Sequence, residues 1–134
     1  MREVLAIAAM GALGAVSRYA VSGYMYRVFG ERLAWGTLAV NVLGSFFLGV
    51  LMVVGFQSSA LPSVWRVGLG IGFLGAFTTY STFSYETVRY LEQGAWGSAL
   101  SNVALNLVLG LAAAAIGLAF GKLVMGVIQT GGLQ

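Results

Sequence analysis

Four apolar segments, each long enough to cross a lipid bilayer, occupy almost the whole chain. They cover residues 4–26, 35–56, 64–90 and 95–125, and the hydrocarbon core of a bilayer requires about 20 residues of helix. In lipid, every backbone N–H and C=O group needs a partner within the protein, which a helix provides by itself. The sequence therefore predicts an all-α membrane protein, with a single four-helix transmembrane domain over residues 1–134 and the lipid bilayer as its surroundings.

The residue types that the chain lacks narrow its function. It contains no histidine, no cysteine and no aspartate, so the usual zinc ligands, disulfides and His- or Cys-dependent nucleophiles are missing. We therefore do not expect an enzyme. The positive charges are scattered singly and form no basic run, so we expect no nucleic-acid partner.

The Lys and Arg residues leave the orientation in the membrane undecided. An even number of spans places both termini on one side, and each side then receives three basic residues: Arg2, Arg66 and Lys122 against Arg27, Arg32 and Arg89. Orientation follows an excess of Lys and Arg on the cytoplasmic loops. Either a single residue near one end decides it, or the chain inserts both ways and opposite copies pair about an axis in the membrane plane.

Two of the segments contain a stripe of small and polar residues at helical spacing. These residues are Thr37, Asn41, Gly44, Ser45 and Gly49 in the second segment and Ser98, Asn102, Asn106, Gly110 and Ala114 in the fourth. Small residues allow membrane helices to pack closely, which is the role we expect for the glycines. The asparagines have two interpretations: they bind one another between helices, or they line a path for something that needs N–H donors.

Two ionisable residues within the segments indicate the charge of a transported species. Arg18 lies inside the first segment, where a cation is costly unless it reaches the interface or faces a partner or water. Glu86 lies near the far end of the third segment and is the only carboxylate inside a segment. A cation-coupled exporter would need an acidic residue at mid-membrane depth. Amides, hydroxyls and an arginine favour an anion instead.

The stretch GFLGAFTTYSTFSYE, residues 72–86, places five serine and threonine side chains inside the third segment. Glycines and consecutive threonines disfavour helix, so we predict a break within residues 75–79. Carbonyls freed at such a break can bind a cation, and carbonyls from two antiparallel copies would converge on the two-fold axis. Beyond the break, Tyr80 and Phe83 stand one turn apart, and their electropositive ring edges suit an anion.

Three stretches of the chain resemble the Fluc family, also called CrcB, of small fluoride channels. The matching residues are GALGAVSRY at 11–19, WGTLAVNVLGSFFLG at 35–49 and the stretch at 72–86. The resemblance implies an antiparallel, dual-topology homodimer in a bacterial inner membrane, with two pathways that export cytoplasmic fluoride passively. It also implies a structural sodium ion at the centre of the dimer interface.

The resemblance further assigns roles to individual residues. Gly75 and Thr78 of both copies would bind sodium through their backbone carbonyls, and Tyr80 and Phe83 correspond to the paired rings whose edges contact fluoride. The other residues implied along the fluoride pathway are Arg18, Asn41, Ser81, Thr82, Glu86, Asn102 and Asn106. One departure concerns position 80, where family members usually have phenylalanine instead of tyrosine.

Two other classes of protein remain open at this point. A small multidrug-type transporter is also a four-span dual-topology dimer, but its first helix should contain a membrane-embedded glutamate where this chain has Arg18. A membrane scaffold that transports nothing would use its polar stripes only for helix packing. In that case, substitution of Asn41 or Asn106 would alter stability without altering any ion flux.

Overall fold

The computed structural model describes residues 1–57 and 61–131, and within these ranges every regular element is helical. The elements are α1 (Arg2–Phe29), α2 (Trp35–Gln57), α3 (Ser63–Val67), η1 (Gly68–Leu74), α4 (Gly75–Phe77), α5 (Tyr80–Glu92) and α6 (Trp96–Gly131). The prediction of an all-α chain with four long segments is confirmed. The third segment consists of the consecutive elements α3 to α5.

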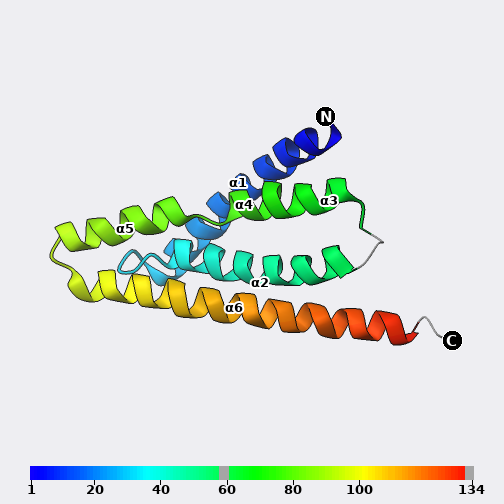
Figure 1. The fold of residues 1–134 in the computed structure, drawn as a ribbon. Helices are drawn as coiled ribbons and strands as arrows, with labels where there is room; N and C mark the ends of the chain where they lie inside the picture. The colour runs from blue at the N-terminus through cyan, green and yellow to red at the C-terminus, as the bar shows by residue number, and fades with distance from the viewer. Residues whose placement is uncertain (58–60, 132–134) are drawn as a thin grey trace.

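Helices α2 and α6 and the segment from α3 to α5 lie roughly side by side, and α1 crosses them obliquely, with both termini toward the same end of the molecule as α3 (Figure 1). Helix α2 packs most extensively against α6, and α1 packs mainly against η1 and α2. The connections at the opposite end join α1 to α2 and α5 to α6. Because α3 and the chain ends lie at one end of the molecule, the three basic residues expected on that side are separated from the three expected on the other side.

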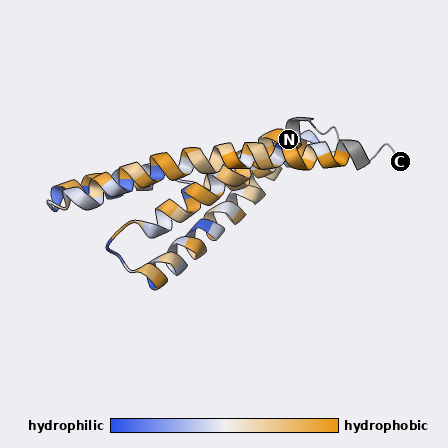
Figure 2. Cartoon of the chain, turned by 90° about the horizontal axis from the view of Figure 1, so that it is seen from below, coloured by the Kyte–Doolittle hydropathy of each residue, from blue (hydrophilic) through white to orange (hydrophobic). Residues whose placement is uncertain are grey.

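Within the residues that the structure describes, three helices are long and apolar enough to cross a membrane: Arg2–Phe29, Trp35–Gly55 and Trp96–Ile128. The third segment runs beside them as two shorter helical stretches, one on either side of a break. Apolar residues follow the helices along their length, and hydrophilic ones gather mainly at the turns (Figure 2). The chain is therefore a multi-pass helical membrane protein.

Glycines bring α2 and α6 into backbone contact. A Cβ added to Gly49 would lie 2.6 Å from the carbonyl oxygen of Ala114, and one added to Gly117 would collide with the carbonyl oxygen of Phe46. Such close approach is the ordinary packing mode of membrane helices. Gly110 makes no such close approach within the single chain, because its nearest neighbour is the Ser45 hydroxyl oxygen, 4.0 Å from an added Cβ.

The third segment departs from an α-helix in two places. Residues 68–74 form a π-helix, which the sequence analysis did not expect. Thr78 and Thr79 are then extended, with φ, ψ of −84°, 159° and −152°, 115°. This confirms the predicted break. The Thr79 hydroxyl accepts a hydrogen bond from the Thr82 N–H (3.2 Å) and so caps the start of α5.

Candidate functional site

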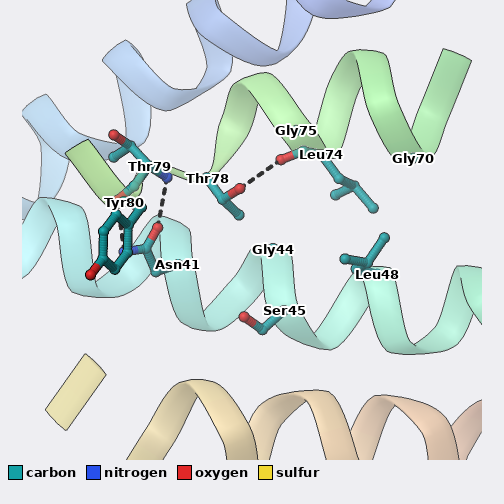
Figure 3. Close-up of a pocket in the computed structure, with 10 residues that line it drawn as sticks. All are labelled: Asn41, Gly44, Ser45, Leu48, Gly70, Leu74, Gly75, Thr78, Thr79 and Tyr80. Carbon is teal, nitrogen blue, oxygen red and sulfur yellow. Dashed lines mark hydrogen bonds between the residues drawn. The ribbon is translucent and has the colours of Figure 1, made fainter. Parts of the chain in front are cut away.

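The break in the third segment is held by the side chain of Asn41 on α2 (Figure 3). The Asn41 Oδ1 accepts a hydrogen bond from the Thr79 N–H (2.8 Å), and the Asn41 Nδ2 donates to the Thr79 carbonyl (3.2 Å). The amide thus binds both backbone groups of Thr79, whose N–H donates to no helical carbonyl. Unwound backbone at membrane depth needs such a partner.

Where α4 ends, two carbonyl groups lack a regular helical donor among the residues that the structure describes. The Thr78 N–H and hydroxyl both donate to the Leu74 carbonyl at 3.0 Å, which completes the last helical turn. The Gly75 carbonyl would ordinarily accept from Thr79, but that N–H is directed to Asn41. The Thr78 carbonyl receives only a long contact, 3.5 Å from Arg18 Nη1. Both carbonyls predicted to bind sodium are therefore available to a further partner.

A cavity of about 290 Å³ adjoins these carbonyls. Its lining residues are Asn41, Gly44, Ser45, Leu48, Gly70, Leu74, Gly75, Thr78, Thr79 and Tyr80. Gly44 leaves room for the break, because an added Cβ would collide with the Thr78 methyl group. The cavity therefore joins the predicted cation site to the start of the predicted anion path.

A second cavity, of about 370 Å³, forms a groove between α2, α5 and α6. It is lined by Asn41, Ser45, Tyr80, Phe83, Val103, Asn106, Leu107 and Gly110. The rings of Tyr80 and Phe83 are tilted by 51° with centroids 5.6 Å apart. Tyr80 is 80% exposed in the single chain. The structure thus brings together both aromatic residues and two of the three asparagines that the sequence singled out.

The three asparagines form a continuous ladder of hydrogen bonds. Asn41 Nδ2 donates to Asn106 Oδ1 (3.0 Å), and Asn106 Nδ2 donates to Asn102 Oδ1 (3.1 Å). Asn102 Nδ2 in turn donates to Thr87 Oγ1 (2.9 Å). Asn102 is 1% exposed, so in this arrangement it supports Asn106 and does not itself face the groove. The first interpretation, binding between helices, thus applies to Asn41 and Asn106, and the Nδ2 of each donates two hydrogen bonds within the protein. Both also reach the groove wall, and their role along an ion path stays a prediction.

The remaining predicted site residues lie farther along α5. Ser81 and Thr82 are exposed on its first turn, and the Thr82 hydroxyl accepts a hydrogen bond from Thr79 (2.9 Å). Glu86 lies outside the lining of the groove, in a third cavity. One of its oxygens accepts a hydrogen bond from the Tyr26 hydroxyl (2.8 Å).

Sequence reasoning missed Tyr26 and Thr87 as parts of this region. Tyr26 is separated from Glu86 by 60 residues along the chain, so no local pattern connects them. The sequence contained a weak indication of Thr87, because this residue lies one helical turn beyond Phe83 on the same helix, which is rich in hydroxyl side chains. Its hydroxyl donates to the Phe83 carbonyl (2.8 Å) and accepts from Asn102.

Comparison with known proteins identifies relatives along most of the chain. The profile of the family described as CrcB-like protein, Camphor Resistance (CrcB), matches residues 5–118. A protein of Syntrophotalea carbinolica named fluoride-specific ion channel FluC is 52% identical over 112 residues, covering 84% of this chain and 91% of the relative. Proteins of the same name from Citrifermentans bemidjiense and Geobacter sulfurreducens are 46% and 48% identical, covering 88% and 83% of this chain and 95% and 90% of the relatives.

Proposed function

The chain belongs to the CrcB-like protein family, and from this premise we propose that it is a fluoride-selective channel that exports cytoplasmic fluoride passively across a bacterial inner membrane. The similar proteins are named as ion channels, so the chain is a transport protein and not an enzyme. The observation that supports fluoride as the ion is the groove between α2, α5 and α6, where amides meet aromatic ring edges.

The chemistry of this groove suits a small, strongly hydrated anion. Such an ion enters a narrow path only where donors replace its water at each step, and it leaves only where each site binds weakly. Ser45 provides a hydroxyl, and Tyr80 and Phe83 provide their ring edges. The Nδ2 groups of Asn41 and Asn106 donate within the single chain, and we propose that they exchange these partners for the passing ion. Arg18 is not among the groove residues, so no full positive charge lies in its wall to trap the ion.

We propose that two copies of the chain pair in antiparallel orientation and enclose two such pathways. In a single chain, Gly75, Tyr80, Ser81 and Thr82 are exposed, although the surrounding segment lies in the membrane. Irregular backbone at that depth is stable only when protein or an aqueous cavity covers it. A second copy placed over the break would provide this cover and close the groove on its open side.

The freed carbonyls at the break suit a structural sodium ion at the centre of this interface. Carbonyl oxygens are hard ligands of the type that alkali cations take, and one chain offers those of Gly75 and Thr78. Two copies related by an axis through the break would offer four. The long contact from Arg18 to the Thr78 carbonyl does not use up the oxygen, because a carbonyl has two lone pairs.

Ion efflux from liposomes tests the function. Reconstituted protein should release fluoride and retain chloride, and equal release of both anions would contradict fluoride selectivity. Asn106→Leu should slow fluoride efflux, whereas Ser101→Ala, on the same helix but outside the groove, should not. A scaffold would show no efflux in any variant. A multidrug-type transporter would instead take up an organic cation in a proton-dependent manner.

A further inference from the structure

A cavity of about 790 Å³ lies where the α1–α2 and α5–α6 connections meet, at the end of the molecule opposite the chain termini (Figure 1). The first connection contributes Arg32 and Leu33 to its lining, and the second contributes Gly94 and Ala95. The volume is within the range of about 300–1,000 Å³ that is usual for ligand sites. None of its lining residues lines the fluoride groove or the cavity at the break.

Two tryptophans place the mouth of this cavity at the membrane surface. Trp35 begins α2 and Trp96 begins α6, and both side chains line the cavity together with Phe29. The rings of Phe29 and Trp35 are in contact, with centroids 5.5 Å apart. Tryptophan is enriched where membrane helices meet the headgroup layer. We therefore call this hollow the interfacial cavity.

The interfacial cavity continues from the surface into the hydrocarbon layer. Its deepest lining residue on α6 is Leu105, which lies nine residues after Trp96 and therefore about 14 Å farther along the helix axis. The hydrocarbon core of a bilayer is about 30 Å thick, so the cavity extends beside roughly one leaflet. Apart from one arginine and two serines, its lining consists of glycines and apolar side chains. This shape and polarity match a molecule with a polar head and an apolar tail.

The polar part of the lining suits an anionic head. Arg32 is its charged residue, and Ser98 and Ser101 lie one helical turn apart on α6. Among the residues that the structure describes, none of these three side chains makes a hydrogen bond or an ion pair, so their donors are open to a ligand. A guanidinium binds a phosphate group through two parallel N–H donors. Basic pockets between membrane helices recognise anionic lipid headgroups in this way.

The interfacial cavity opens on the side of α6 that faces away from the fluoride groove. Ser101 lines the cavity and Gly110 lines the groove. Nine residues separate them, which is two and a half helical turns, so they lie on opposite sides of the helix. A second copy that closes the groove covers the side of Gly110. The side of Ser101 is then left to the surrounding lipid.

We propose that the interfacial cavity binds one anionic phospholipid, with the headgroup phosphate at Arg32 and an acyl chain along the apolar wall toward Leu105. The serine hydroxyls of α6 add donors to the headgroup, and the tryptophans enclose the glycerol region between the two connections. The lipid would thus join the α1–α2 connection to the start of α6. This site is separate from the ion pathway, and its occupancy does not depend on fluoride transport.

Thermal unfolding of the full-length protein in detergent, with added lipid, tests the site. Dioleoylphosphatidylglycerol should raise the unfolding temperature, because a ligand that binds the folded state stabilises it. Dioleoylphosphatidylcholine, which has the same acyl chains and no net charge, should raise it less. Arg32→Gln should weaken the apparent affinity for phosphatidylglycerol roughly tenfold, as expected for the loss of charge-assisted hydrogen bonds. Equal stabilisation of the wild-type protein by the two lipids would overturn the proposal.

Two further variants separate the cavity from general surface charge. Arg27→Gln removes the same charge at the same end of the molecule, but Arg27 lies outside the cavity and its Nε donates to the Gly23 carbonyl (3.2 Å). This matched control should keep the wild-type affinity. Gly97→Leu keeps every charge and fills the cavity, where an added Cβ meets nothing within 4 Å, so it should weaken binding. Equal losses in Arg27→Gln and Arg32→Gln would overturn the proposal, as would unchanged binding in Gly97→Leu.

The same preparations distinguish a lipid from other occupants. Glycerol 3-phosphate has the phosphate without acyl chains and should not stabilise the protein. Stabilisation equal to that by phosphatidylglycerol would indicate a site for soluble anions and contradict a lipid site. If a second copy fills the cavity instead, Gly97→Leu should shift the protein toward monomers in size-exclusion chromatography without changing lipid affinity, which would also overturn the proposal. Native mass spectrometry should retain about one phosphatidylglycerol per wild-type chain. A retained lipid in Gly97→Leu at the wild-type level would contradict this location.

Discussion

The resemblance to the family implies phenylalanine at position 80, so the hydroxyl of Tyr80 is a chemical difference of this chain. The ring lies against Phe83 and lines the groove, so the hydroxyl is available to donate to a passing anion and delay it. We expect Tyr80→Phe to raise fluoride efflux by roughly two- to tenfold, the equivalent of one neutral hydrogen bond. Thermal unfolding should be unchanged. Equal efflux rates in liposomes would show that the hydroxyl does not reach the ion.

Asn102 differs from the other two asparagines because it is buried and bonds to Asn106 and Thr87. Asn102→Leu would leave these two partners unsatisfied, which should lower the free energy of unfolding by about 1–3 kcal/mol. Fluoride efflux should fall as well, because Asn106 loses its support at the groove wall. Chemical denaturation and efflux measured on one preparation check both effects. Reduced stability with normal efflux would mean that Asn106 keeps its position without the ladder.

Among the elements, the contact between α2 and α6 depends on Gly117. Gly117→Ala would force the new methyl group against the Phe46 carbonyl oxygen, which is backbone and has little freedom to move. Such overpacking should cost about 1–3 kcal/mol and lower the thermal unfolding temperature in detergent. Gly97→Ala is the matched control on the same helix, since an added Cβ there meets nothing within 4 Å. Equal unfolding temperatures of the two variants would contradict this account of the interface.

The elements also show what the sequence determined and what it left open. The four segments and the break were predictable, because length, hydropathy and a run of glycines and threonines are local properties. The π-helix of η1 was not, since its backbone passes against α1, where a Cβ added to Gly14 would collide with the Phe73 carbonyl oxygen. That contact joins residues far apart in sequence. The bond between Tyr26 and Glu86 was missed for the same reason.

The sequence predicted the parts of the site whose residues lie close together along the chain. Tyr80 and Phe83 are one turn apart on α5, and their pairing follows from helical spacing. The use of the asparagine donors was left open, because a side-chain amide at a helix face has no preference between a neighbouring helix and an ion. Only the packing of α2, α5 and α6 assigns Asn41 to the break and Asn102 to Thr87.

At the scale of the whole molecule, the distribution of charge favours insertion in both orientations. The end with both termini has Arg2, Arg66 and Lys122, and the other end has Arg27, Arg32 and Arg89, so neither end has the excess that would fix its side. Because the chain contains no cysteine, Gln93→Cys provides a single exposed label site. An impermeant thiol reagent applied to intact cells should modify about half of the copies.

Adding basic residues at one end of the molecule should then abolish fluoride efflux without altering the fold of the single chain. Glu3→Arg/Ser63→Arg adds two arginines at the end with the termini, and Glu31→Arg/Glu92→Arg adds two at the opposite end. Each variant alone should insert in one orientation and lose fluoride efflux, because no antiparallel partner forms to close the groove. Expression of the two together should restore efflux, since each then supplies the orientation that the other lacks. Full efflux from a single biased variant, with thiol labelling that is all or none, would mean that the pathway closes without an antiparallel partner.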